Sequence, residues 1–343
     1  MVAYYWKIIK KLVVDYSNPI LRKARGKNTS IIVWKFGELN PDKIIYFITD
    51  MSSEGSGIFS MYIGILEHLL AAKNMGWVPV IDDTPALFRR NKHKFRKKEN
   101  VMNEMFAFNN EVSVQEALNS KNVIISSMTD LRCLREVKSD KKIVKNKTFF
   151  DYSEDDLRHW RIFADENLPY KQEVQEELIN ALNQVVGKKK NILGVAIREG
   201  KMGMNASGLN ASGEYKQPTI EKIIDVVEEY LNTWECDYVY LSCETEKAID
   251  MFRKKMGNEI VLSLPRLRMD FDYVMNIRSM KDGLRKDSRN VLLQENYKKY
   301  DLDYVKDMYI LSKCDFFITP INCGTEVAFL KNDNLKDYFV IKE

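Results

Sequence analysis

Histidine is scarce in this 343-residue chain: His68, His93 and His159 are the only three, and they are widely separated. The sequence has no HExxH motif and no Cys/His cluster, which argues against a zinc site. It also has no GxxxxGK[ST] motif, which excludes a P-loop ATPase. The five cysteines form no CxxC pair and no signal peptide precedes them, so we expect a reducing, cytoplasmic location. No apolar run approaches the roughly 18 residues that a membrane span needs.

Charge of either sign is nearly balanced, with 53 Lys and Arg against 49 Asp and Glu, a net charge of +4. This sum is too small to identify a nucleic-acid-binding protein. Two segments are nevertheless basic: residues 1–27, which also carry aromatic side chains, and residues 89–98 (RRNKHKFRKK). The first segment can lie on an anionic membrane surface or pack as a terminal helix, and the second can contact phosphates or be a solvated loop.

The first half of the chain contains one clear βαβ pattern. Residues 44–48 (IIYFI) form an apolar run of the buried-strand type, and apolar residues recur at helical spacing from Ile58 until Gly76. Residues 77–81 (WVPVI) predict a second strand, and residues 123–126 a third. A strand, a helix and a second strand in this order indicate a parallel sheet.

The second half repeats the alternation of strands and helices after a polar helix expected at about 171–186. The expected strands are 192–197, 238–242, 259–262 and 316–319, and the expected helices are 219–234, 246–256, 303–313 and 325–330. The pattern predicts an α/β fold with two Rossmann-like halves, one over residues 1–170 and one over residues 171–343.

In open parallel sheets ligands bind at the carboxyl ends of the strands, so the residues that follow each strand are candidate site residues. Arg198 follows the strand at 192–197 and opens a loop rich in small residues that includes Lys201. An arginine here can bind a phosphate with two parallel hydrogen bonds, although it can also be a surface residue paired with a neighbouring acid. Glu244 follows the strand at 238–242. The last strand is followed by Asn322, Cys323, Gly324 and Thr325, a turn that opens a helix whose N-terminus would favour a pyrophosphate.

Cys323 and residues 55–60 are two further candidates for chemistry, and each has an interpretation other than the one its residues first suggest. Cys323 could be a reactive thiol, but no histidine lies near it in sequence, so we expect it to be buried. Residues 55–60 (GSGIFS) approximate the GxGxxG motif, and Asp82 or Asp83 lies about 25 residues further on. This leaves an NAD-dependent oxidoreductase as an alternative, weakened by the serine in place of the third glycine.

Several of these segments together resemble the α1,6-/α1,2- and protein O-fucosyltransferase superfamily, which includes the bacterial nodulation fucosyltransferases. The resemblance lies in GVAIREGK (194–201), YVYLSCE (238–244) and DYVKDMYILSKCDFFIT (303–319) with the small-residue turn after it. It implies a GT-B arrangement, in which two Rossmann-like domains with parallel sheets face a cleft. In the family an HxRR-type motif contacts the β-phosphate of the donor. Here Arg198 matches one arginine of that motif, and Glu199 replaces the second.

Two further family motifs are matched only in part. The TDD-like turn corresponds to Ser242-Cys243-Glu244, which keeps one acid, and EGSGIF (54–59) resembles the Gly-rich first loop beside the acceptor cleft. The resemblance therefore assigns Gly55 and Gly57 to the acceptor side, and Glu244, Asn322, Gly324 and Thr325 to the donor.

The implied activity is the inverting, metal-independent transfer of a sugar, by default fucose, from a GDP-sugar to a glycan or lipid-linked glycan in bacterial surface polysaccharide synthesis. The GDP-sugar is a co-substrate, and no cofactor or nucleic-acid partner is expected. Arg198, assisted by Lys201, would stabilise the departing diphosphate. Glu54 is the candidate base, although an exposed loop acid explains it equally well. The enzyme would act in the cytoplasm or at the inner membrane face through residues 1–27.

Two alternatives remain besides the oxidoreductase. A metal-dependent GT-A transferase would use a DxD motif, for which the sequence offers residues 270–272 and 301–303, though neither follows an evident strand. A polyanion-binding or RNA-binding protein would use the two basic segments.

Overall fold

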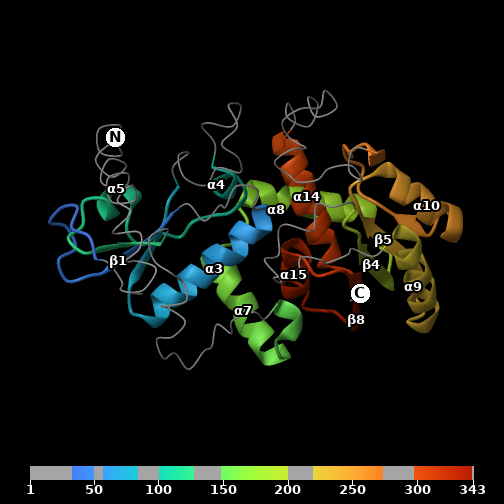
Figure 1. Cartoon of the computed structure of the whole chain (residues 1–343), viewed down its shortest axis with the longest axis horizontal. Helices are drawn as coiled ribbons and strands as arrows, with labels where there is room; N and C mark the ends of the chain where they lie inside the picture. The colour runs from blue at the N-terminus through green and yellow to red at the C-terminus, as the bar shows by residue number, and fades with distance from the viewer. Residues whose placement is uncertain are drawn as a thin grey trace, which may run out of the picture. The chain divides into compact units, whose positions relative to one another are not determined.

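The computed structural model describes residues 33–49, 57–83, 100–126, 148–199, 219–272 and 297–341 (Figure 1). The chain divides into two compact units. Of the described residues, the first unit holds 33–49, 67–82 and 110–126, and the second holds the remainder. The boundary expected at residue 170 lies within the second unit by this division, because residues 148–199 pack with the helices of the C-terminal part.

The first unit is built on a three-stranded parallel sheet with the order β2-β1-β3. The strands are β1 (Ile45–Ile48), β2 (Val78–Ile81) and β3 (Val123–Ile125). The expected strands and their parallel pairing are thus confirmed. One face of the sheet packs on the short helix α5 (Val114–Ala117) through a cluster of apolar side chains. On β1, Tyr46 forms a buried 2.5 Å hydrogen bond between its hydroxyl and Nδ1 of His68, so that histidine is structural.

The second unit is built on a five-stranded sheet with the order β6-β5-β4-β7-β8, and all of its pairings are parallel. The strands are β4 (Ile192–Ala196), β5 (Tyr238–Ser242), β6 (Val261–Leu262), β7 (Phe316–Thr319) and β8 (Asp337–Val340). The α/β class with two parallel sheets, expected from the sequence, is confirmed.

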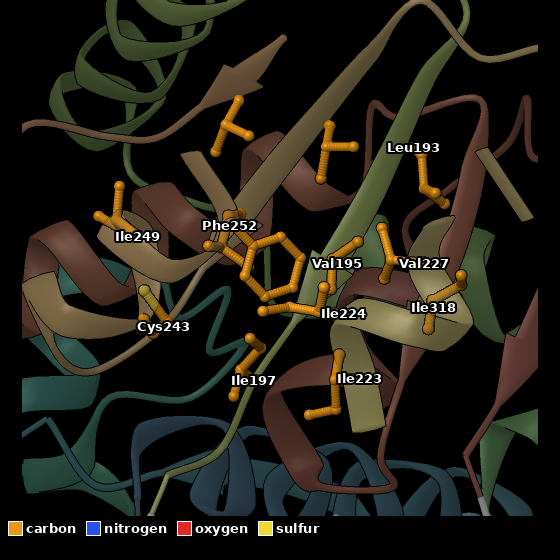
Figure 2. Packing of buried hydrophobic residues seen from close by; sticks show 14 of the residues in the cluster. Leu193, Val195, Ile197, Ile223, Ile224, Val227, Cys243, Ile249, Phe252 and Ile318 are labelled. Atoms are coloured by element: carbon orange, nitrogen blue, oxygen red, sulfur yellow. The ribbon is translucent and has the colours of Figure 1, made fainter. Parts of the chain in front are cut away.

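Helices cover both faces of this second sheet. The helices α9 (Ile220–Thr233) and α10 (Glu246–Met256) lie side by side, as Figure 1 shows, and pack on one face. Figure 2 shows this core, in which Phe252 of α10 and Ile224 of α9 pack around Val195 of β4. Because all five residues of β4 are buried, its apolar sequence does not alternate with polar residues.

The opposite face packs on α14 (Tyr297–Leu311). Gly194 of β4 makes this close packing possible, because a Cβ there would lie 3.0 Å from Sγ of Cys314 and 3.1 Å from Leu311. Outside α14 lies α8 (Gln172–Val185), and α15 (Cys323–Leu330) contacts α14, α7 (Glu154–Asn167) and the 3₁₀ turn η2 (Phe149–Asp151).

Two further helices complete the described chain. Helix α3 (Ile58–Asn74) begins and ends where the helical spacing of the sequence predicts, and α4 (Val101–Met105) begins at the N-cap Asn100. None of the helices among the described residues is both long and apolar enough to cross a bilayer.

Candidate active site

The order in which the chain adds strands to the second sheet reverses between β4 and β7. From β4 the chain continues to β5 and β6 on one side, and it returns to β7 and β8 on the other. In such sheets ligands bind in the crevice at the carboxyl ends of the two neighbouring strands where the strand order reverses. A pocket lies at this point, lined by the last residues of β4 and β5, by residues that follow β4, β5, β6 and β7, and by residues of α14 and α15. The lining residues are Ala196, Ile197, Arg198, Ser242, Cys243, Glu244, Arg266, Tyr304, Met308, Asn322 and Thr325.

Arg198 lines the pocket directly after β4, where its side chain is half-buried. The backbone leading to it is fixed, because Ile197 continues the ladder of β4 by donating to the carbonyl of Ser242 over 2.8 Å. A guanidinium at the end of a central strand can bind an anionic oxygen with two parallel hydrogen bonds.

Glu199 does not point to a ligand but joins two loops of the site. Its carboxylate accepts hydrogen bonds from the backbone N–H of Glu244 at 2.6 Å and of Thr245 at 2.8 Å, and from the hydroxyl of Thr245. Glu199 is 3% exposed, and this burial raises its pKa against the lowering effect of the Thr245 hydrogen bond. The residue that replaces the second arginine of the family motif is therefore a structural acid in this chain.

Glu244 lines the same pocket from the loop after β5. Its carboxylate accepts a 2.8 Å hydrogen bond from the hydroxyl of Tyr300 on α14. The backbone of Glu244 is fixed by Glu199 and its side chain by Tyr300, so it presents a carboxylate of defined position to the pocket.

The turn after β7 is a helix cap. Oδ1 of Asn322 accepts from the backbone N–H of Gly324 at 3.0 Å and of Thr325 at 3.1 Å, and the Thr325 hydroxyl accepts in return from the N–H of Asn322 at 3.1 Å. Because Asn322 already occupies these two N–H groups, an anion near α15 would be favoured mainly by the positive end of the helix dipole. Gly324 packs against α14, where a Cβ would lie 2.2 Å from the Tyr304 hydroxyl oxygen. The structure thus brings Asn322 and Thr325 to the pocket and gives Gly324 a packing contact.

A buried ion pair, which the sequence analysis did not anticipate, joins Arg266 of the pocket lining to Asp307 of α14. Nε of Arg266 lies 2.8 Å from Oδ2 of Asp307, and the two side chains are 1% and 0% exposed. Tyr240 donates to the other oxygen of Asp307 at 2.5 Å. Burial opposes the charge of Arg266, but the neighbouring carboxylate of Asp307 raises its pKa, so the guanidinium stays charged. The only sequence signal for this group is the pair of arginines in PRLR (265–268) after β6.

Of the two cysteines near the pocket, Cys243 is buried and Cys323 is half-buried. Burial raises the pKa of Cys323 and of Cys243, although charged groups nearby include Arg198 and Arg268 respectively. A thiol with a raised pKa is a poor nucleophile at neutral pH. Cys323 is half-buried, so the expectation that it is buried is met only in part.

Several predicted site residues lie outside the described residues. They are Glu54, Gly55 and Lys201, together with the basic segments 1–27 and 89–98. Gly57 is described: its carbonyl accepts the hydrogen bond from Met61 that starts α3, and a Cβ on it would meet open space.

The acids that the alternative functions would use, Asp301, Asp303 and Asp82, lie within a helix or are buried. Among the described residues no three His, Cys, Asp or Glu side chains cluster as metal ligands would. Asp301 and Asp303 lie within α14, and Asp303 pairs with Lys299 at 2.6 Å. In the first unit Asp82 is fully buried and accepts a hydrogen bond from the Thr49 hydroxyl at 3.4 Å, which makes it a poor ligand for the ribose of a dinucleotide.

Comparison with known proteins finds similarity at the level of solved structures. No protein-family model and no curated protein matches the chain. A crystal structure of NodZ α-1,6-fucosyltransferase soaked with GDP-fucose aligns at 13% identity and a TM-score of 0.46, covering 84% of this chain and 92% of that one. A fucosyltransferase NodZ structure from Bradyrhizobium aligns at 14% identity with a TM-score of 0.44 over 84% and 92%. POFUT1 in complex with GDP-fucose aligns at 9% identity and a TM-score of 0.47, covering 88% and 99%.

Proposed function

We propose that this chain is a glycosyltransferase that transfers a sugar, by default fucose, from a GDP-sugar to a glycan acceptor. The observation that carries the proposal is the convergence of Arg198 and the N-terminus of α15 on one pocket between β4 and β7. A cation and the positive end of a helix dipole at a switch point form a binding site for a diphosphate. The motifs that resemble fucosyltransferases support GDP as the nucleotide.

In this proposal the chemistry is an inverting displacement at the anomeric carbon. As the bond between the sugar and the diphosphate breaks, negative charge grows on the β-phosphate, and the Arg198 guanidinium stabilises it. The acceptor hydroxyl attacks from the opposite face and loses its proton to a base, for which Glu54 remains the candidate. No metal takes part, and Lys201 adds a second positive charge. The N-terminal part, residues 1–170, would hold the acceptor in a GT-B arrangement.

The proposed pathway rests on the same resemblance, and the proposed location rests on the basic residues 1–27. A glycan or lipid-linked glycan intermediate of bacterial surface polysaccharide would be the acceptor, and residues 1–27 would bring the enzyme to the inner face of the membrane.

A thermal-shift panel of GDP, UDP, CMP, ADP, NAD and a short RNA tests the donor site. At 100 times its dissociation constant a ligand adds about 2.7 kcal/mol to stability, so GDP should raise the melting temperature visibly. The variant Arg198→Ala should lose this shift. The variant Arg158→Ala is the matched control, because Arg158 is an exposed arginine of α7 in the same unit and should keep the shift.

Release of fucose from GDP-fucose should also continue in EDTA and should fall about 100-fold or more in Arg198→Ala, the size expected for a lost charge-stabilising donor. A shift with NAD or RNA and none with GDP would contradict the proposal. So would unchanged GDP binding in Arg198→Ala.

A further inference from the structure

Glu199 holds its two carboxyl oxygens against different kinds of partner. Oε2 accepts from the backbone N–H of Glu244 at 2.6 Å and of Thr245 at 2.8 Å, whereas Oε1 faces the hydroxyl of Thr245. An N–H group only donates, but a hydroxyl donates to a carboxylate and accepts from a carboxylic acid. One lone pair of this hydroxyl oxygen accepts from the N–H of Ala248 at 3.4 Å, which leaves the other for Glu199. Oε1 can therefore carry a proton while each of these contacts is kept.

The charge of Glu199 is held in a buried place by neutral groups. Glu199 is 3% exposed, and its three donors are two backbone N–H groups and a hydroxyl. A buried carboxylate held by neutral donors loses much of the stabilisation that water gives its charge. Burial accordingly raises the pKa of Glu199, while the Thr245 hydrogen bond lowers it and the charge of Glu244 raises it further.

The titratable and charged groups around this carboxyl and its loop follow β4, β5 and β6. They are Arg198, Cys243, Glu244, Arg266 and Arg268. Nε of Arg266 lies 2.8 Å from Oδ2 of Asp307, and Nε of Arg268 lies 3.1 Å from Oε1 of Glu246. These two arginines are therefore paired with carboxylates of their own. Burial raises the pKa of Cys243, so that side chain stays a neutral thiol.

A bound donor would change the charge beside Glu199. A GDP-sugar carries two negative charges on its diphosphate, and the proposed site brings them to Arg198, the residue directly before Glu199. Glu244, whose backbone Glu199 holds, lines the same pocket. Negative charge nearby favours the neutral form of a carboxyl group. By linkage, a ligand that favours the protonated protein binds more tightly to it.

We propose that Glu199 takes up a proton when the GDP-sugar binds, so that the affinity for the donor falls as the pH rises. The proton comes from the solvent and is held on Oε1, facing the Thr245 hydroxyl, and no bond of the donor changes. This coupling rests on the proposed donor site. Glu199 is a positioning residue, because it acts through the loops that carry Arg198 and Glu244.

The test measures the dissociation constant of GDP-fucose for the full chain, without acceptor, from about pH 5 to pH 8. GDP-fucose is the probe because, unlike GDP, it has no phosphate oxygen that titrates in this range. We expect the wild-type affinity to fall as the pH rises, by up to about tenfold per pH unit for one proton. Calorimetry at one pH, in buffers of different ionisation enthalpy, should show the uptake of up to about one proton per complex.

Glu199→Gln is the decisive variant, because its side chain reproduces the protonated acid. Its carbonyl oxygen can accept from the two N–H groups while its amide donates to the Thr245 hydroxyl. GDP-fucose should bind to it with an affinity that does not change with pH. At pH 8 this affinity should be about 10-fold or more above that of the wild type, whose charged Glu199 opposes the donor.

Two further variants assign the proton. Glu244→Gln should keep a pH-dependent affinity, because Glu199 still takes up the proton. Glu173→Gln is the matched control, since Glu173 is an exposed acid of α8 in the same unit, and its pH dependence should equal that of the wild type.

The outcomes separate the two proposals. A wild-type affinity that does not change with pH, or the same pH dependence in Glu199→Gln as in the wild type, would overturn the coupling and keep the donor site. A pH dependence lost in Glu244→Gln and kept in Glu199→Gln would overturn it too. If Glu199→Gln does not fold, calorimetry on the wild type and on Glu244→Gln decides, and a lack of proton uptake in either overturns the coupling. Failure of GDP-fucose to bind at any pH would overturn both proposals.

Discussion

At the residue scale, the buried carboxylate of Glu199 connects the loop that carries Arg198 with the loop that carries Glu244. It does so by accepting three hydrogen bonds from residues 244 and 245. This connection fixes the distance between a cation and a carboxylate that both face the pocket. In the proposed site this acid would position the two loops without contacting the ligand.

The raised pKa of Glu199 predicts a pH dependence of stability. Since its pKa is higher in the folded chain than the ordinary value of 4.5, the unfolded chain releases this proton first. The folded state binds more protons over this range, so stability falls as pH rises from about 4.5 through the folded pKa. The variant Glu199→Gln keeps an acceptor for the two N–H groups and cannot ionise. Denaturant titrations from pH 4 to 8 should show its stability gaining on wild type as pH rises.

The comparison has its own control. Glu199→Ala removes the acceptor as well as the charge, so it should lose about 1–3 kcal/mol at pH 4.5, where Glu199→Gln resembles wild type. If the difference between Glu199→Gln and wild type did not change with pH, the raised pKa would be wrong.

At the element scale, strands with continuous apolar sequence could be predicted, and so could the polar helix α8, whereas the polar sequences of β8 and α7 did not predict those elements. Residues 238–242 and 316–319 are strands with the predicted bounds, because buried parallel strands show as apolar runs. The edge strand β8 begins with the exposed Asp337 and Tyr338, so it has no such run. Helix α7 buries only Leu157, Trp160 and Ala164, and most of its other residues are polar.

The site shows the same limit. Arg198, Glu244 and Asn322 could be chosen because each follows a predicted strand, and all three line the pocket. Arg266 follows the two-residue strand β6, and Asp307 lies in a helix, where nothing in the local sequence signals a buried charge. Pairing between residues 266 and 307 depends on the tertiary fold, which sequence periodicity does not report.

Arg161 joins helix α7 to the end of α15, beside the ion pair of Asp165 with Lys331, and it allows a test of this packing. Arg161 donates from Nε to the carbonyl of Leu330 at 2.8 Å and from Nη2 to that of Asn332 at 2.7 Å. We expect Arg161→Ala to lower the free energy of unfolding by about 1–3 kcal/mol, because two carbonyls lose a charged donor. Arg158→Ala on the same helix removes only an exposed pair with Asp155 and should cost less than about 1 kcal/mol. Equal effects in the two variants would show that the Arg161 contacts add no stability.

At the scale of the whole molecule, each compact unit is assembled from segments that are far apart in sequence. Residues 57–66 and 100–109 belong with the C-terminal sheet, and residues 110–126 with the N-terminal one. The chain order therefore gives a poor guide to which residues fold together. All the described pocket residues nevertheless belong to one unit, the second.

This distribution makes a prediction for hydrogen exchange. A bound ligand slows hydrogen exchange at those amides that exchange only through an opening of the protein that also releases the ligand. The exchange rate of these amides falls by a factor of about one plus the ratio of ligand concentration to dissociation constant. With GDP at 100 times that constant, amides of 243–245 and 322–326 should exchange up to about 100-fold more slowly. The strands β1, β2 and β3 of the first unit should be unaffected, because no described residue of that unit lines the pocket. In Arg198→Ala the same GDP concentration should protect neither unit, since its affinity would be lost. Equal protection of β1 and of residues 322–326 would mean that GDP binding also depends on the first unit. The proposed donor site would then have to include residues of that unit.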